Sequence, residues 1–241
     1  MRLVADLHIH SVATGHAYCT INEMAQAAAD IGLEMIAITD HGPSMPDGPH
    51  LYYFGNLRVL PPTIAGVQVL KGIEANIIGL SGELDLPDHM LAQLDIVLAG
   101  FHSHTGYEGN GVLENTQAII GALENPHVDG IVHPGNPVFP VDAREVVAAA
   151  FDLGKLIEIN NASLTVSRLG SMENCVEFAE LAAEYGAKVI ISSDAHHTSL
   201  VGNFDRAIKL VKSVGLESEY VLNTDVRKIT EFLRKRRKAL N

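Results

Sequence analysis

Short apolar stretches alternate with segments of helical periodicity along the whole chain. Seven stretches rich in β-forming residues predict strands at 3–10, 34–41, 68–77, 94–103, 129–135, 155–163 and 188–197. Runs such as IVLAG and VIISS are apolar at consecutive positions, which suits strands buried on both faces of a parallel sheet. The alternation of strand and helix therefore predicts an α/β fold, and both an open doubly wound sheet and a closed barrel fit the pattern.

The helices between the predicted strands carry start and stop signals. Capping residues and terminal glycines mark four of them, which run from Thr20 to Gly32, Asp142 to Gly154, Ser171 to Gly186, and Asn203 to Gly215. Two longer stretches, 42–56 and 79–89, are predicted to be irregular, and both directly follow strands. Because loops after the carboxyl ends of strands build the sites of α/β folds, we expect the first stretch to form a lid through Tyr52, Tyr53 and Phe54.

The composition is that of a chain that can bury a sizeable core. Its 241 residues are 47% hydrophobic with a mean hydropathy of +0.15, and no linker or repeat divides them, which predicts a single domain over residues 1–241. No apolar run reaches the roughly 18 to 20 residues that cross a bilayer, and the charged start MRLVADLHIH is unlike a secretion signal. We therefore expect a cytoplasmic protein. Because only Cys19 and Cys175 are present, any metal must be held by histidines and carboxylates.

The net charge of −12 hides a basic segment at the end of the chain. Residues 225–241 hold seven Lys or Arg against two acidic residues, so this segment carries +5 and the rest of the chain −17. We interpret the segment as a solvated terminal helix whose Ile229, Phe232 and Leu233 pack inward, and the alternative is a patch for nucleic acid or another anion. The acidic remainder of the chain opposes nucleic acid over most of the surface.

The first predicted strand contains the motif DLHIHS, which starts at Asp6. Successive side chains of a strand point to opposite faces, so Asp6, His8 and His10 are expected on one face. Two neighbouring imidazoles on one face can coordinate the same metal ion. Twelve histidines in 241 residues give roughly 0.6 such pairs by chance, so the pair needs support from elsewhere in the chain.

That support comes from the ends of the other strands. Six of the seven predicted strands end in, or run directly into, residues that commonly ligate metals: His8, His10 and His16, then His41, Glu74, His102, His133, and finally Asp194 with His196. The sixth strand offers Asn160 and Asn161 instead. In a parallel barrel all carboxyl ends open on one face, so these residues would meet in a single cavity and form a metal site.

The segments DLHIHS, ITDHG, GIEANI, GFHSH, GIVHPG and SSDAHH, in this order, resemble the PHP (polymerase and histidinol phosphatase) family of metal-dependent phosphoesterases, most closely its YcdX-type subgroup. The resemblance covers nearly the entire chain. It implies a distorted (β/α)7 barrel, similar to a TIM barrel, with the active site at the carboxyl ends of the strands. It also implies three divalent metal ions, usually zinc, with manganese or iron as alternatives, and the trimeric assembly known in the subgroup.

Carried over position by position, the resemblance distributes nine ligands over the three ions. One ion would lie on His8, His10, Glu74 and Asp194, the second on Glu74, His102 and His133, and the third on His16, His41 and His196. Imidazoles mixed with carboxylates suit zinc, manganese or iron, whereas calcium and magnesium prefer cages of oxygen atoms. No organic cofactor is expected. Asp6, Asp40 and His104 are expected to orient ligating imidazoles from behind.

The charge of such a site favours an anionic substrate. Three divalent ions and two carboxylates leave about +4 in the pocket, and water on such an ion reaches a pKa of about 7. We therefore predict hydrolysis of phosphate monoesters by a metal-bound hydroxide, with a small phosphorylated metabolite as the substrate. Asp194 and His196 are the candidates for managing protons. Arg168, in TVSRLG after the sixth strand, is the candidate phosphate clamp.

Other functions remain open at this point. A phosphodiesterase or exonuclease acting on nucleotide ends is the nearest rival, supported only by the basic segment, and we expect no stable binding of nucleic acid or membrane. Amidohydrolases share the initial His-x-His but usually carry a lysine on the fourth strand, and LDIVLAGFHS has none. A metal-binding module without catalysis would be suggested by a missing ligand, and all nine positions are filled.

Overall fold

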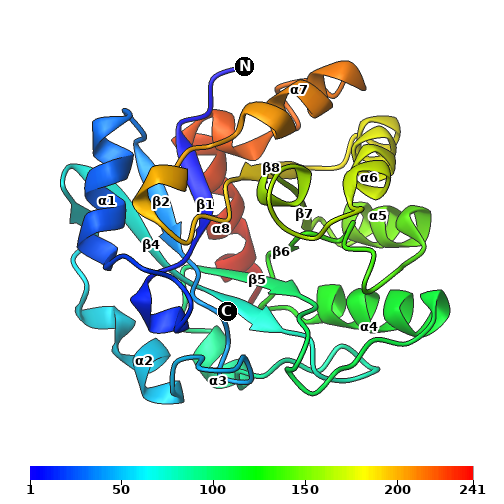
Figure 1. Ribbon diagram of the computed structural model, residues 1–241, viewed down its shortest axis with the longest axis horizontal. Helices are drawn as coiled ribbons and strands as arrows, with labels where there is room; N and C mark the ends of the chain where they lie inside the picture. The colour runs from blue at the N-terminus through cyan, green and yellow to red at the C-terminus, as the bar shows by residue number, and fades with distance from the viewer. Residues whose placement is uncertain (241) are drawn as a thin grey trace.

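The computed structural model describes residues 1–240, with side chains as far as Arg237. All seven predicted strands are confirmed: β1 Ala5–Ile9, β2 Met35–Ile38, β4 Val67–Asn76, β5 Ile96–Gly100, β6 Gly130–Ile131, β7 Leu156–Asn160 and β8 Val189–Ser192. They are parallel and neighbour one another in this order, and the sequence did not reveal β3, Thr63–Ile64, which pairs antiparallel with β4. The strands form a nearly closed barrel surrounded by helices (Figure 1). The fold is thus the distorted (β/α)7 barrel, and the open sheet is excluded.

The helices confirm the predicted signals and fill some stretches predicted to be irregular. In the described part of the chain they are α1 Ile21–Asp30, α2 Leu51–Asn56, α3 Asp88–Leu91, α4 Val112–Glu124, α5 Ala143–Asp152, α6 Met172–Tyr185, α7 Asp205–Ser213 and α8 Val226–Leu240. The capping box of Thr20 and Glu23 is formed, and Gly186 ends α6 in the left-handed conformation. None of these helices is long and apolar enough to span a membrane.

The stretch 42–56 is tied to the barrel by its aromatic residues. It contains the helix α2, where Phe54 is buried in the core and the Tyr53 hydroxyl donates a hydrogen bond to Asp40. Tyr52 is exposed. The prediction of an irregular loop is therefore confirmed for residues 42–50 and wrong for Leu51–Asn56, because Phe54 and Tyr53 gain buried partners that hold this part in helical form.

The core has two layers, which explains where α8 lies. The larger cluster fills the space between the strands and the surrounding helices, and the smaller one joins strand residues to Ile229 and Leu233 of α8. Several members of the smaller cluster are the first residues of their strands, namely Ala5, Met35, Ile96 and Leu156. The helix α8 therefore covers the amino-terminal end of the barrel, behind the strands in Figure 1. Ile229 and Leu233 are buried and Phe232 packs against them, as predicted; the Lys238 side chain lies outside the described residues.

The seam between β1 and β8 is closed by a polar side chain. Asn223, in the short 3-10 helix η5 (Leu222–Thr224), donates from Nδ2 to the carbonyl oxygens of Ala5 at 2.8 Å and Ile191 at 2.6 Å. Its Oδ1 accepts from the Ile191 amide at 3.1 Å. At the other end of the seam, the His10 amide donates to Ala195 at 2.9 Å. Asn223 thus satisfies backbone groups that a closed sheet would pair directly.

An irregularity in β1 overturns the expected common face of Asp6, His8 and His10. The register against β2 shifts between Asp6 and Ile9, and Leu7 and Ile9 pack in different core clusters although they are two residues apart. The bulge breaks the alternation, so Asp6 faces the segment after β8 instead. There it accepts hydrogen bonds from Ser193 and from the Gly202 amide at 3.0 Å. Asp6 therefore does not orient a histidine of the motif.

Candidate metal centre

The residues predicted as ligands gather at the carboxyl ends of the strands. Seven of the nine are buried: His8, His10, His41, Glu74, His102, His133 and Asp194. The other two lie nearer to solvent, His196 with 26% of its side chain exposed and His16 in the exposed loop after β1. Residues that are up to 188 positions apart in the sequence, from His8 to His196, thus share one site.

Glu74 lies at the centre of this site and connects two groups of histidines. Its Oε1 is 2.9 Å from His102 Nε2 and 2.6 Å from His133 Nε2. Its Oε2 is 2.7 Å from His41 Nδ1 and 3.2 Å from His8 Nε2. The carboxylate is fully buried. Each oxygen therefore faces a different set of imidazoles, as a bridging ligand between two ions would.

The remaining histidines extend the site toward solvent. The ring of His196 lies 4.2 Å from that of His10, centre to centre, and 5.1 Å from that of His16. The ring of His16 lies 5.2 Å from that of His41. His16, His41 and His196 are thus neighbours, but the donor atoms that lie close enough to share one ion are those of His10, His41 and His196, and those of His41, Glu74 and His102.

Two independent observations indicate that the donor atoms are arranged to bind divalent metal ions. Around His8, His10 and Asp194, the Nε2 atoms of the histidines are 3.0 Å apart, and Asp194 Oδ1 lies 3.2 Å from His10 Nε2 and 3.6 Å from His8 Nε2. Ligand atoms about 2.1 Å from a tetrahedral zinc are roughly 3.4 Å apart, so these separations are those of atoms around one ion.

The second observation is that buried donors lack hydrogen-bond partners. His41 Nδ1, Glu74 Oε2 and Asp194 Oδ1 are buried without a hydrogen bond, although His41 and Glu74 approach to 2.7 Å. Leaving such a group unsatisfied costs about 1–3 kcal/mol, so natural proteins rarely do it without a reason. Lone pairs directed at a shared cation explain both the close approach and the missing hydrogen bond.

The electrostatics of the site keep most of the ligands in metal-binding forms. His8 is the exception, because against the opposing effect of burial the carboxylates of Glu74, Glu158 and Asp194 raise its pKa well above the usual value, so a cation would have to displace a proton there. Burial lowers the pKa of His10 well below its usual value, and the neighbouring His196 and His41 lower it further. Partial burial and the same kind of neighbours lower the pKa of His16 to about 4. Burial would raise the pKa of Glu74, but the surrounding histidines hold it well below the ordinary range. Neutral imidazoles beside an ionised carboxylate are what a divalent cation requires.

Sequence reasoning missed Glu158, which lies behind the site on β7. Its Oε1 is 2.7 Å from His8 Nδ1 and also accepts a hydrogen bond from Ser192. Its Oε2 accepts from the His133 amide at 2.7 Å and from Asn160 Nδ2 at 3.0 Å. Glu158 thus aims His8 Nε2 at the site, the role that we expected of Asp6. The available signal was one acid in the otherwise apolar run LIEIN.

The other histidines are oriented by neutral side chains. Asn76 Oδ1 lies 2.7 Å from His102 Nδ1, whereas His104, predicted for this place, is exposed with a left-handed backbone at φ 67°. Thr14 Oγ1 lies 3.3 Å from His10 Nδ1 and donates to Asp40 Oδ1 at 2.7 Å. The prediction for His104 was therefore wrong, and Asp40 reaches His10 only through Thr14.

Arg168 lies beside Asp194 at the edge of the site. Its Nη1 donates to Asp194 Oδ2 at 2.9 Å, and 16% of the arginine side chain is exposed. Both residues, together with His133, have positive φ angles of 51°, 57° and 35°. Such angles cost of order 1–3 kcal/mol in residues other than glycine and concentrate at functional sites. The arginine is therefore held in place as part of the site.

Comparison with known proteins agrees with this geometry. The family model for the PHP domain matches residues 6–222. Proteins named "probable phosphatase" from Thermoanaerobacter sp. strain X514 and from Acetivibrio thermocellus are each 49% identical over 240 residues, covering 100% of this chain and 98% and 99% of theirs. A Lactococcus lactis histidinol phosphate phosphatase, solved with zinc, L-histidinol and phosphate, superposes with a TM-score of 0.57 at 15% identity, over 88% of this chain and 94% of its own. This chain belongs to the PHP domain family.

Proposed function

We propose that this protein is a metal-dependent phosphatase that hydrolyses phosphate monoesters of small metabolites. The observation that carries the proposal is the buried Glu74, whose two oxygens face separate groups of histidines while its Oε2 has no hydrogen-bond partner. The relatives named as phosphatases, at 49% identity over the full chain, support the same reaction class.

The metal ions would be held by the nine residues as the family resemblance distributes them, with Glu74 shared between two ions. Zinc is the first candidate because the donors are mainly imidazoles, with manganese or iron as alternatives. When bound, such ions polarise phosphoryl oxygens and make a bound water nucleophilic near neutral pH. The interatomic distances around His8, His10 and Asp194 support the first of these ions, and the assignment of the other ligands and the number of ions are part of the proposal.

The residues of the chain itself would bind the phosphate and move protons. Arg168 Nη1 donates hydrogen bonds to Asp194, Ser163 and Ser167. We assign the remaining guanidinium N–H groups of Arg168 to binding the phosphoryl oxygens of the substrate. His196 Nδ1 lies 3.0 Å from the carbonyl oxygen of Asp194, which fixes the ring. His196 is more exposed than Asp194. We therefore assign His196, together with Asp194, to proton transfer at the leaving group.

The monoesterase is favoured over the nucleotide-end hydrolase by the position of the basic segment. The helix α8 packs against the first residues of the strands, at the amino end of the barrel, whereas the histidines lie at the carboxyl ends of the strands. The cations of α8 whose side chains are described, as far as Arg237, therefore do not line the candidate metal centre. The rival proposal loses the feature that supported it.

Metal analysis combined with a screen of phosphorylated metabolites tests the proposal. The wild-type protein should contain divalent metal and hydrolyse phosphate monoesters faster than diesters such as bis(p-nitrophenyl) phosphate. His41→Ala should lose metal and activity together, whereas His89→Ala, at an exposed histidine outside the site, should retain both. A fully metal-loaded wild-type protein that hydrolyses no phosphoester would contradict the function and leave the metal centre intact.

A further inference from the structure

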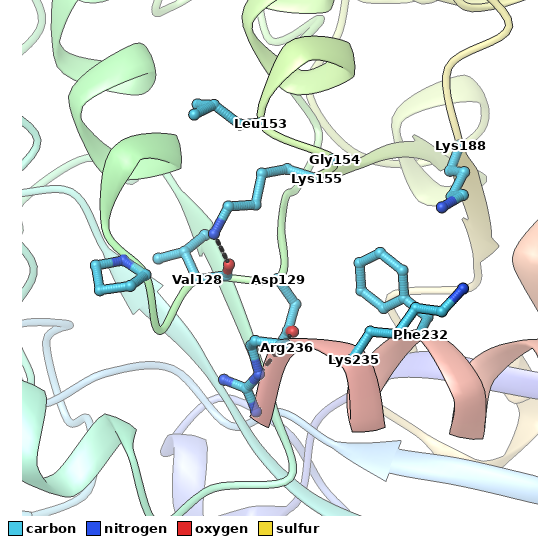
Figure 2. Close-up of a pocket in the computed structure, with 10 residues that line it drawn as sticks. Val128, Asp129, Leu153, Gly154, Lys155, Lys188, Phe232, Lys235 and Arg236 are labelled. Atoms are coloured by element: carbon cyan, nitrogen blue, oxygen red, sulfur yellow. Dashed lines mark hydrogen bonds and ion pairs between the residues drawn. The ribbon is translucent and has the colours of Figure 1, made fainter. Parts of the chain in front are cut away.

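A cavity lies at the opposite end of the barrel from the histidines. It has a volume of about 340 Å³ and is lined by residues that precede β6, β7 and β8 together with residues of α8: Val128, Asp129, Lys155, Lys188, Phe232, Lys235 and Arg236, among others (Figure 2). Because the strands are parallel, a strand of five residues such as β7 places roughly 16 Å between the two ends. Nothing in the proposed phosphatase mechanism uses this cavity.

Two of the four cations around the cavity are neutralised locally. Arg236 Nε lies 3.0 Å from Asp129 Oδ1, and Lys235 Nζ lies 2.9 Å from Glu231 Oε1. Each of these pairs brings no net charge to the cavity. Their side chains therefore form its wall without attracting an anion strongly.

The other two cations, Lys155 and Lys188, have no carboxylate within ion-pair distance among the described side chains. Lys155 Nζ donates to the carbonyl oxygens of Val128 and, at 3.1 Å, Asn125, which engages two of its three N–H groups. Lys188 Nζ lies 5.6 Å from the centre of the Phe232 ring. In Figure 2 the two lysines stand on opposite sides of the cavity, with the Lys155 ammonium turned toward Val128 and the Phe232 ring nearer to Lys188. The cavity therefore keeps a charge of about +2 after its internal pairs are counted.

We propose that this cavity binds a small molecule with a dianionic phosphate group, held between the ammonium groups of Lys155 and Lys188. The residual charge of the cavity equals that of a phosphate or phosphomonoester dianion, and lysine is a common point-charge partner of phosphate. The volume falls within the range of small-molecule pockets, so the ligand has room for an organic part beside the Phe232 ring. Such a ligand binds far from the metal centre and does not compete for it.

Amide chemical shifts distinguish this cavity from the metal centre. The probes are inorganic phosphate and phenylphosphonate, whose C–P bond is not an ester and survives a phosphatase. Titrated at pH 8 into the zinc-loaded, ¹⁵N-labelled protein, each should shift the amides of residues 153–155, 188 and 232–236 in a saturable way, in addition to any shifts at the histidines. If the shifts saturate at a lower concentration of phenylphosphonate than of phosphate, the natural ligand is a phosphate ester. If they saturate at a lower concentration of phosphate, it is free phosphate. Either result supports the site.

Lys188→Glu provides the decisive variant because Lys188 is exposed and its replacement leaves the core unchanged. Both probes should bind the cavity at least about tenfold more weakly, while shifts at the metal centre remain. Lys209→Ala, at an exposed lysine of α7 outside the cavity, should bind as the wild type does. Unchanged cavity shifts in Lys188→Glu, or no cavity shifts in the wild type, would overturn the proposal. Cavity shifts with a short RNA but with neither probe would overturn it as well, in favour of a nucleic-acid surface.

Discussion

The two ends of the barrel are formed by the same strands, but their charged and polar groups differ in the partners that they contact. At the carboxyl end, His41 Nδ1, Glu74 Oε2 and Asp194 Oδ1 are buried without hydrogen bonds. At the amino end, His127 Nδ1, Asp129 Oδ1 and Arg236 Nε also lack hydrogen bonds, but Asp129 Oδ1 and Arg236 Nε form an ion pair at 3.0 Å, and Arg236 Nη1 donates to the carbonyl of His127 at 2.6 Å. The unbonded atoms at the carboxyl end thus surround one site, whereas two of those at the amino end neutralise each other and fix α8.

The backbone repeats this difference. The positive φ angles of His133, Arg168 and Asp194 occur at the carboxyl end, whereas at the amino end Ala65, in the turn before β4, has one among the described non-glycine residues. The amino end is filled by an apolar cluster that includes Leu7, Ile229 and Leu233. Strain and unsatisfied groups cost stability, whereas apolar burial supplies it. The amino end thus stabilises a barrel whose carboxyl end is shaped for chemistry.

The largest effect is expected from Glu74→Gln, because Glu74 lies at the centre of the carboxyl-end site. The amide lacks the negative charge that two groups of histidines face, so metal content should fall and phosphatase activity should drop by more than about 100-fold, beyond the loss typical of residues behind a ligand. Metal analysis and steady-state kinetics measure this. Glu217→Gln, at an exposed acid, is the matched control. A variant with full metal content would show that Glu74 is not a ligand.

Replacing Glu158 should have the next largest effect. Glu158→Gln keeps the shape of the side chain but weakens the hydrogen bonds to His8 and to the His133 amide. We expect metal affinity to fall by about 10- to 100-fold, measured by competition with a chelator of known affinity. Glu173→Gln, on the outer helix α6, serves as the control. Unaltered affinity would mean that Glu158 only stabilises the fold.

Arg168→Lys should separate substrate binding from metal binding. Lysine keeps the positive charge beside Asp194 but not the planar fork that binds two phosphoryl oxygens. We expect KM for a phosphate monoester to rise by about tenfold while metal content stays that of the wild type. The exposed Arg206 offers a matched Arg→Lys control. An equal loss of metal in Arg168→Lys would assign the arginine to holding Asp194.

The smallest effect concerns stability at the amino end. Burial raises the pKa of Asp129 to about 6, against the opposing effect of Arg236. Between pH 5 and 7 the unfolded chain therefore holds fewer protons on this group than the folded chain does, so stability should fall with rising pH by about 1 kcal/mol. Urea unfolding of the wild type and Asp129→Asn at both pH values measures the difference. Identical pH dependence in the two proteins would contradict the raised pKa.

Much of the site could be predicted from the sequence because its ligands follow recognisable strands. Local signals such as the capping box of Thr20 and Glu23 depend on residues close in the chain. The convergence of His8 and Glu74 required only that the strands be parallel and closed into a barrel. The sequence marks Glu158 only as a lone acid within a buried strand, and it could not name the partner of Glu158, because His8 is 150 positions away and the hydrogen bond between them depends on how the barrel closes.

The sequence by itself determined the seven parallel strands, most of the helices and the set of residues that meet at the carboxyl ends, since hydrophobic period and capping act over a few residues. Only the tertiary structure decided that a bulge turns Asp6 away, that Asn223 closes the seam and that Lys155 and Lys188 face one cavity. These outcomes depend on contacts between distant segments. Their energies are fixed by packing and by the partners that burial leaves available, and a local pattern carries neither.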